Sequence, residues 1–169
     1  MMNTVSIRPE TAADSHAIAT LIAAAFRHDP HSLHNEHTIV HALRCSGELS
    51  VSLVAQQTGQ VVGHVAVSPV RVADGSHGWY GLAPLAVLPD YQGQGIGTQL
   101  VQQALAALRR LDAAGCVVLG EPAYYARFGF QTMPTLYLAG VPAAYFQALS
   151  FNSGRPAGEV RYHPAFTAA

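Results

Sequence analysis

The stretch from Leu85 to Thr98, LAVLPDYQGQGIGT, decides the fold because it changes character twice over a short distance. Its first residues close an apolar run, Trp79–Leu88, that predicts a strand. Pro89–Gly97 is a glycine-rich loop, and the residues after it repeat apolar side chains at helical spacing. The stretch therefore predicts a strand, a glycine loop and a long helix in succession.

A glycine loop of this kind can bind an anion without a cationic side chain. Glycines adopt backbone conformations that a Cβ would forbid, so successive N–H groups can converge on one point. The start of the following helix adds free N–H groups and the positive end of the helix dipole. The loop therefore favours an anionic ligand, and a pyrophosphate would suit it.

Two other phosphate-binding motifs do not match the residues present. A P-loop requires a Gly-Lys pair, whereas the nine basic residues of this chain are all arginines. A dinucleotide fingerprint requires glycine at its sixth position, and counting from Gly93 or Gly95 places Thr98 or Leu100 there. What remains is Gln92-x-x-Gly95-x-Gly97, which taken alone could also be a helix entry without a ligand.

Composition limits the class of protein. Of 169 residues, 50% are hydrophobic and 11% are charged, which is typical of one compact soluble domain. The formal net charge of −1 does not favour binding to nucleic acid or to a membrane surface. Cys45 and Cys116 lie far apart in the sequence, and there is no second pair of cysteines to build a zinc site or a disulfide framework. The N-terminus lacks the pattern of a secretory signal, so we expect a cytoplasmic protein.

The rest of the chain alternates strand and helix signals. The predicted strands are Val5–Arg8, Val51–Gln56, Val61–Val67, Trp79–Leu88 and Cys116–Leu119, with weaker signals at Leu136–Leu138, Phe146–Phe151 and Glu159–Tyr162. The predicted helices are one that begins at Thr11 with Asp14 in a capping box, one over His34–Arg44, the long helix after the loop, and a short one over Pro122–Phe128. Thr58-Gly59-Gln60 predicts a hairpin connection, and Gly115 suits the position that ends the long helix.

With these segments in place, the chain resembles the Gcn5-related N-acetyltransferases (GNAT) over nearly its whole length. Gln92-x-x-Gly95-x-Gly97 is similar to the family's acetyl-CoA pyrophosphate loop, and Tyr125 stands before Gly129-Phe130 as in its second signature. Leu119–Tyr125 and Gly158–Phe166 resemble the YhbS-like subgroup. The resemblance implies an α/β (α+β) fold in a single domain over residues 1–169. Its sheet would be mixed and mostly antiparallel, with six to seven strands flanked by about four helices.

The resemblance also implies an enzyme that moves an acetyl group from acetyl-CoA directly to a primary amine, without a metal. The backbone of Leu85, Ala86 and Val87 would pair with the pantetheine arm, and an N–H of Ala86 or Val87 would polarise the thioester carbonyl. The residues implied at the pyrophosphate are Gln92, Gly93, Gln94, Gly95, Ile96, Gly97 and Thr98.

The implied general acid is Tyr125, which would protonate the CoA sulfur. The general base is open. Glu121 follows a strand but also fits an acid at a helix N-terminus, His64 lies on another strand, and a water chain needs no single base. The family's Asn-x-x-Ala step falls on Val118 and Glu121, so that contact to pantetheine is not expected.

Two further interpretations of the sequence stand beside the enzyme hypothesis. The histidines His28, His31, His34, His37 and His41 suggest a metal site, but no nearby carboxylate or cysteine completes a tight set, and a polar rim at the acceptor entrance is the better interpretation. The second function class is an acyl-CoA-binding or sensing domain with little turnover. The expected partners are acetyl-CoA and an amine, with a homodimer possible and neither nucleic acid nor membrane involved.

Overall fold

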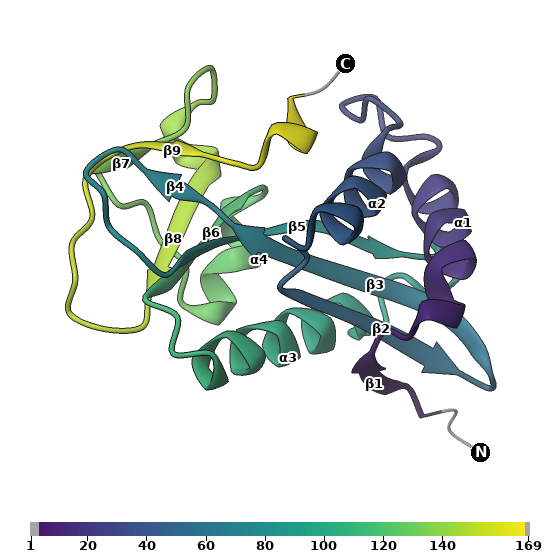
Figure 1. Ribbon diagram of the computed structural model, residues 1–169. Coiled ribbons are helices and arrows are strands. Elements are labelled where there is room, and N and C mark those ends of the chain that lie inside the picture. Colours follow the sequence, from purple (N-terminus) through teal and green to yellow (C-terminus); the bar gives the residue numbers. More distant parts are fainter. Residues whose placement is uncertain (1–3, 168–169) are drawn as a thin grey trace. The chain divides into compact units, whose positions relative to one another are not determined.

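The computed structural model describes residues 4–167, and Figure 1 shows the elements in chain order. The α-helices are α1 Ser15–Phe26, α2 Glu36–Ser46, α3 Ile96–Arg110 and α4 Pro122–Tyr125. The strands are β1 Ser6–Pro9, β2 Val51–Gln57, β3 Gln60–Pro69, β4 Arg71–Val72, β5 Trp79–Val87, β6 Gly115–Leu119, β7 Leu136–Tyr137, β8 Phe146–Ser150 and β9 Gly158–Arg161.

Six of the strands form one sheet in the order β1-β2-β3-β5-β6-β8, and β4-β9-β7 form a smaller sheet. In the larger sheet β5 pairs with β6 in parallel, whereas β1 with β2, β2 with β3 and β6 with β8 are antiparallel. This confirms the predicted mixed, mostly antiparallel sheet with four helices. Among residues 4–167, none of the helices combines the length and the apolar character that crossing a bilayer would require.

The chain forms two compact units, and each has its own core. The first contains residues 4–67 and 84–104, and the second contains residues 68–83 and 105–167. In the first unit α1 and α2 pack on one face of the sheet (Figure 1). That core consists of Ile18, Leu21, Ile22, Val40, Val54, Ala66 and Ala86.

The start of α3 packs closely on β3 within the first unit. A Cβ on Gly63 of β3 would come within 2.9 Å of Leu100 Cδ1 and 3.2 Å of Ile96 Cγ2. Both of those side chains are buried, as the helical spacing of apolar residues predicted. A glycine at position 63 therefore allows α3, and the loop before it, to lie directly on the strand.

The entry to α1 is fixed by Asp14. Its carboxylate accepts the backbone N–H of Thr11 at 2.7 Å, as the predicted capping box requires. The same carboxylate takes two hydrogen bonds from the Arg8 guanidinium, at 2.7 and 3.0 Å. Asp14 therefore joins the end of β1 to the start of the first helix.

A two-residue turn joins β2 to β3. Thr58 and Gly59 have φ values of 48° and 78°, which suit the twist of a tight hairpin. The hairpin is thus confirmed, but Gln60 is not in its turn: it pairs with Gln57 as the first residue of β3.

The predicted role of Gly115 at the end of the long helix is wrong. The helix α3 ends at Arg110, and Asp112 takes the left-handed conformation with φ of 57°. Gly115 is the first residue of β6, where a Cβ would lie 2.5 Å from the ring atom Cζ3 of Trp79. Glycine is required there because the indole occupies the space, and Trp79 is a member of the core of the second unit.

Candidate functional site

The predicted pyrophosphate loop connects β5 to α3. Gly93 and Gly95 have φ values of 77° and 82°, in the left-handed region that side chains with a Cβ rarely adopt. No atom lies within 4 Å of the place where either Cβ would be, so these glycines serve the backbone conformation and not the packing. The helix α3 begins at Ile96, so Gly97, which the sequence placed in the loop, lies in the first helical turn. The N–H groups of that turn therefore adjoin the loop.

A cavity of about 450 Å³ opens beside this loop, within the first unit. Leu85, Ala86 and Val87 at the end of β5 line it together with Gln92, so the structure brings these predicted cofactor residues to one place. The Gln92 amide Nε2 donates a hydrogen bond to the Val87 carbonyl oxygen at 3.0 Å, which ties the loop to the strand. The opposite wall is the end of α1 and the residues after it, which the sequence analysis did not assign to the cofactor site.

The three strand residues differ in what their side chains do. Ala86 is buried and packs in the core beneath α1, whereas Leu85 and Val87 are only half-buried. The side chain of Ala86 faces the core. The part of this strand that lines the cavity is therefore largely backbone and small apolar surface. Such a surface suits a ligand that pairs with main-chain N–H and C=O groups.

Tyr125 is held firmly at the end of α4 in the second unit. Its ring lies against Gly120, where a Cβ would come within 2.6 Å of ring atom Cε2, and it packs edge-to-face on Phe130 at 5.8 Å between centroids. Burial raises the pKa of Tyr125 to about 12, and neighbouring Tyr124 and Cys116 add to the shift. The hydroxyl therefore keeps its proton at neutral pH, as a proton donor must.

Glu121 precedes Pro122 at the start of α4. Its backbone oxygen accepts the N–H groups of Tyr124 and Tyr125 at 3.1 and 3.2 Å, and its side chain is exposed. This position suits an acid that interacts with the helix dipole, and the exposure also leaves the carboxylate accessible to a substrate. Both interpretations of Glu121 remain predictions.

His64, the other candidate base, is enclosed in the first unit. It is 0% exposed, and its Nε2 lies 2.8 Å from the Ser52 hydroxyl. Ser52 in turn donates to the Glu10 carboxylate, so Nε2 carries the proton and Nδ1 is left buried without a partner among the described residues. The side chain therefore presents no accessible surface at which it could meet a substrate.

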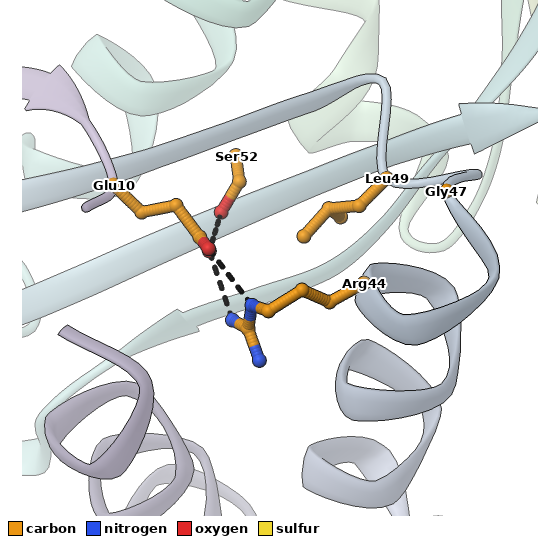
Figure 2. Close-up of a pocket in the computed structure, with 5 residues that line it drawn as sticks. All are labelled: Glu10, Arg44, Gly47, Leu49 and Ser52. Carbon is orange, nitrogen blue, oxygen red and sulfur yellow. Dashed lines mark hydrogen bonds and ion pairs between the residues drawn. The ribbon is translucent and has the colours of Figure 1, made fainter. Parts of the chain in front are cut away.

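Figure 2 shows the Glu10 carboxylate between the Ser52 hydroxyl and the Arg44 guanidinium. Arg44 donates through Nε and Nη2 at 2.8 and 2.9 Å. Burial opposes ionisation of Glu10, but the hydrogen bonds from Arg44 and Ser52 outweigh it and hold the pKa of that carboxyl below its usual value. The shallow pocket beside these residues therefore carries charges that already neutralise each other.

The histidine-rich segment does not assemble a metal site. His34 has a φ of 59° and precedes α2, so it does not share a helical face with His37 and His41. Within the part of the chain that the structure describes, no three histidine, cysteine, aspartate or glutamate side chains are grouped as metal ligands.

Comparison with known proteins identifies the family to which the chain belongs. The model of the acetyltransferase (GNAT) family matches residues 15–130, which include β5, the glycine loop and Tyr125. The chain belongs to the GNAT family. The uncharacterized N-acetyltransferase YhbS of Escherichia coli K12 is 44% identical over 126 residues, which are 74% of this chain and 72% of YhbS. The expected resemblance to the YhbS-like subgroup of GNAT proteins is thereby confirmed.

Two solved GNAT structures match almost the whole chain. A GNAT acetyltransferase from Brucella melitensis, in complex with acetyl-CoA, is 45% identical, with a TM-score of 0.87 over 98% of this chain and 99% of that one. The structure of Escherichia coli YhbS in complex with CoA is 36% identical, with a TM-score of 0.88 over 99% of this chain and 94% of that one. Membership of this family makes the protein an N-acetyltransferase by class.

Proposed function

We propose that this GNAT protein transfers the acetyl group of acetyl-CoA directly to a primary amine of a small molecule or a protein. The observation that carries the proposal is the cavity in which Leu85, Ala86, Val87 and Gln92 meet beside the left-handed glycines of the loop. The relative from Brucella melitensis, which is 45% identical, is an acetyl-CoA complex and supports the same ligand here.

In this proposal the two parts of the cofactor site bind different parts of acetyl-CoA. The backbone of Leu85, Ala86 and Val87 pairs with the amide groups of the pantetheine arm, as an added strand would. The loop and first helical turn, Gln92–Thr98, surround the pyrophosphate with N–H groups and the positive end of the helix dipole. A chain without lysine therefore still has a binding site for two phosphates.

The transfer itself needs a donor and an acceptor of protons. As the amine nitrogen forms its bond to the carbonyl carbon, an N–H of Ala86 or Val87 stabilises the charge on the oxygen. The C–S bond then breaks, and Tyr125 gives its proton to the sulfur. The proton that the amine loses goes to Glu121 or to a water chain, and the burial of His64 supports these acceptors over the histidine.

Calorimetric titration with acetyl-CoA tests the cofactor site, with Gly95→Val as the perturbation. The wild type should bind, and Gly95→Val should weaken binding at least about tenfold, because the loop loses its left-handed conformation. The matched control is Gly75→Val. Gly75 has a φ of 84° against 82° for Gly95, and both have open space at the Cβ position. Equal weakening in both variants, or no binding by the wild type, would refute the assigned site.

Tyr125 separates the enzyme from an acyl-CoA sensor on the same fold. Tyr125→Phe should lower the rate of CoA release about 10²–10⁴-fold and leave acetyl-CoA affinity unchanged, since the hydroxyl acts on the leaving group. Tyr145→Phe, at a tyrosine that is 46% exposed, is the control and should keep full activity. A wild-type protein that binds acetyl-CoA but acetylates no amine would instead support the sensor.

The remaining features of the proposal concern the molecule as a whole. We propose that residues 1–169 act as one GNAT domain, because the family model spans residues of both compact units. The near-neutral charge supports a cytoplasmic protein whose partners are acetyl-CoA and an amine, without nucleic acid or membrane. A homodimer, which the family resemblance allows, is tested by light scattering of the purified chain.

A further inference from the structure

A second cavity, of about 690 Å³, lies within the second unit where β5 and β6 separate. The two strands pair in parallel through Trp79↔Gly115, Tyr80↔Cys116 and Gly81↔Val117, and the paired register ends there. Ala83 and Leu119, each two residues beyond the last pair, line the cavity. Ligands commonly bind beyond the carboxyl ends of parallel strands, and this volume suits a small molecule.

The surface of this cavity is mainly apolar. Its apolar lining residues include Ala83, Leu119, Leu138, Val160, Pro164 and Phe166. Leu119 keeps 49% of its surface exposed, which is unusual for a large apolar side chain at a strand end beside a cavity. An apolar ligand would cover it.

The charged residues of the lining already neutralise each other. Among the described residues that line the cavity, two are charged, Glu159 and Arg161. They form an ion pair at 2.6 Å between Oε1 and Nε, and Arg161 is largely exposed. Each of these side chains already has a counter-charge. Neither is therefore free to attract a second charge on a ligand. The cavity therefore does not suit a polyamine, an amino sugar with several amines, or a basic peptide.

Tyr162 lines the cavity, but its hydroxyl is too enclosed to be part of the surface that a ligand meets. The hydroxyl oxygen of Tyr162 is buried and has no hydrogen bond among the described residues. Its ring is fixed on Gly81, where a Cβ would come within 2.6 Å of Cε2, and against Phe166 at 5.1 Å between centroids. Burial, and then the nearby Cys116 thiol and Tyr125 hydroxyl, raise the pKa of Tyr162 well above its usual value, so it stays a neutral hydroxyl.

We propose that this cavity receives the acyl acceptor, and that the acceptor is an amine carried on an uncharged apolar body. The apolar body fills the space lined by Ala83, Leu119 and the segment 158–167, all within the second unit. The Tyr162 side chain, fixed on Gly81, forms part of the wall that this body contacts. The inference rests on the proposed acetyl transfer and specifies the substrate of that reaction.

Three amines of equal length test the substrate class: hexylamine, 1,6-diaminohexane and 6-aminohexanoate. They present the same primary amine and differ only in the far end, which is uncharged, positive or negative. With acetyl-CoA saturating, kcat/KM for hexylamine should exceed that for either charged amine at least about tenfold, the discrimination expected from burying one uncompensated charge. 2-Phenylethylamine, with an uncharged aromatic body, should rank with hexylamine.

Leu119→Asp places a charge at the cavity without disturbing a buried side chain. It should raise KM for hexylamine and lower KM for 1,6-diaminohexane, while the acetyl-CoA affinity by calorimetry stays at the wild-type value. Leu111→Asp is the matched control, since Leu111 is 52% exposed, directly follows α3 and does not line the cavity. It should leave the ranking of the amines unchanged.

The outcomes separate this inference from the proposed function. Acetylation of the charged amines at rates equal to or above hexylamine would overturn the apolar acceptor and leave acetyl transfer standing. A Leu119→Asp variant that behaves like Leu111→Asp would likewise overturn the cavity as the acceptor site. If acetyl-CoA does not bind, or binds while no amine is acetylated, the proposed function fails and the inference fails with it.

Discussion

Acidification should destabilise this protein through His64. The side chain is 0% exposed and neutral, and burial lowers its pKa from 6.5 to about 4. Glu10 opposes this shift, while Arg44 adds to it, and the lowering prevails. Because the pKa is lower in the folded state, the unfolded chain binds a proton first as the pH falls. The stabilising effect is therefore complete above about pH 6.5 and is lost between about pH 6.5 and pH 4.

The size of the effect follows from the two pKa values. With about 4 in the folded chain and 6.5 in the unfolded chain, the free energy of unfolding falls by about 2 kcal/mol between about pH 7.5 and pH 5. The full difference, reached below about pH 4, is roughly 3 kcal/mol. For a chain of this length, 2 kcal/mol corresponds to a drop in Tm of roughly 4–8 °C.

The assay is urea unfolding, followed by circular dichroism, at about pH 7.5 and pH 5. His64→Gln removes the titration, so this variant should lose about 2 kcal/mol less than the wild type between the two pH values. His16→Gln controls for the loss of a titratable group as such, because it removes one histidine from the exposed surface of α1. If wild type and His64→Gln lose stability equally on acidification, the assignment of a neutral, buried His64 is refuted.

Two further substitutions test contacts that the structure shows. Gly81→Ala should displace the Tyr162 ring, since the new Cβ would lie 2.6 Å from Cε2. We expect a loss of about 1–3 kcal/mol in stability and a higher KM for the amine, with acetyl-CoA affinity kept as measured by calorimetry; an unchanged KM would contradict the role of Tyr162. Asp14→Asn should cost about 1–3 kcal/mol in urea unfolding, because the carboxylate that accepts two hydrogen bonds from Arg8 and two from Thr11 is lost; a variant as stable as the wild type would show that these bonds contribute nothing.

Much of the fold could be predicted because its signals are local. Apolar spacing placed α1 and α3, and the alternation of β-branched residues placed β2 and β3. Glycines can also be recognised in the sequence, and they favour left-handed backbone conformations. The loop that contains Gly93 and Gly95 was therefore predicted to bind a ligand, and both glycines have positive φ values. For the same reason the family could be identified from motifs that each occupy one short stretch of chain.

Other features of the structure depend on contacts between distant segments. Ser52, His64 and Glu10 meet because the register of β1, β2 and β3 aligns them, and no local pattern encodes a register. Tyr162 is placed by its packing on Gly81, although its own segment carried only a weak strand signal.

The chain by itself thus determined the strand, loop and helix of the proposed cofactor site, because backbone preference and hydrophobic period act over a few residues. Only the tertiary structure decided that His64 is enclosed, that Gly115 makes room for Trp79, and that Tyr162 lines a cavity with a hydroxyl lacking a partner. The physical reason is that burial and packing are properties of neighbours in space, and those neighbours are distant along the chain.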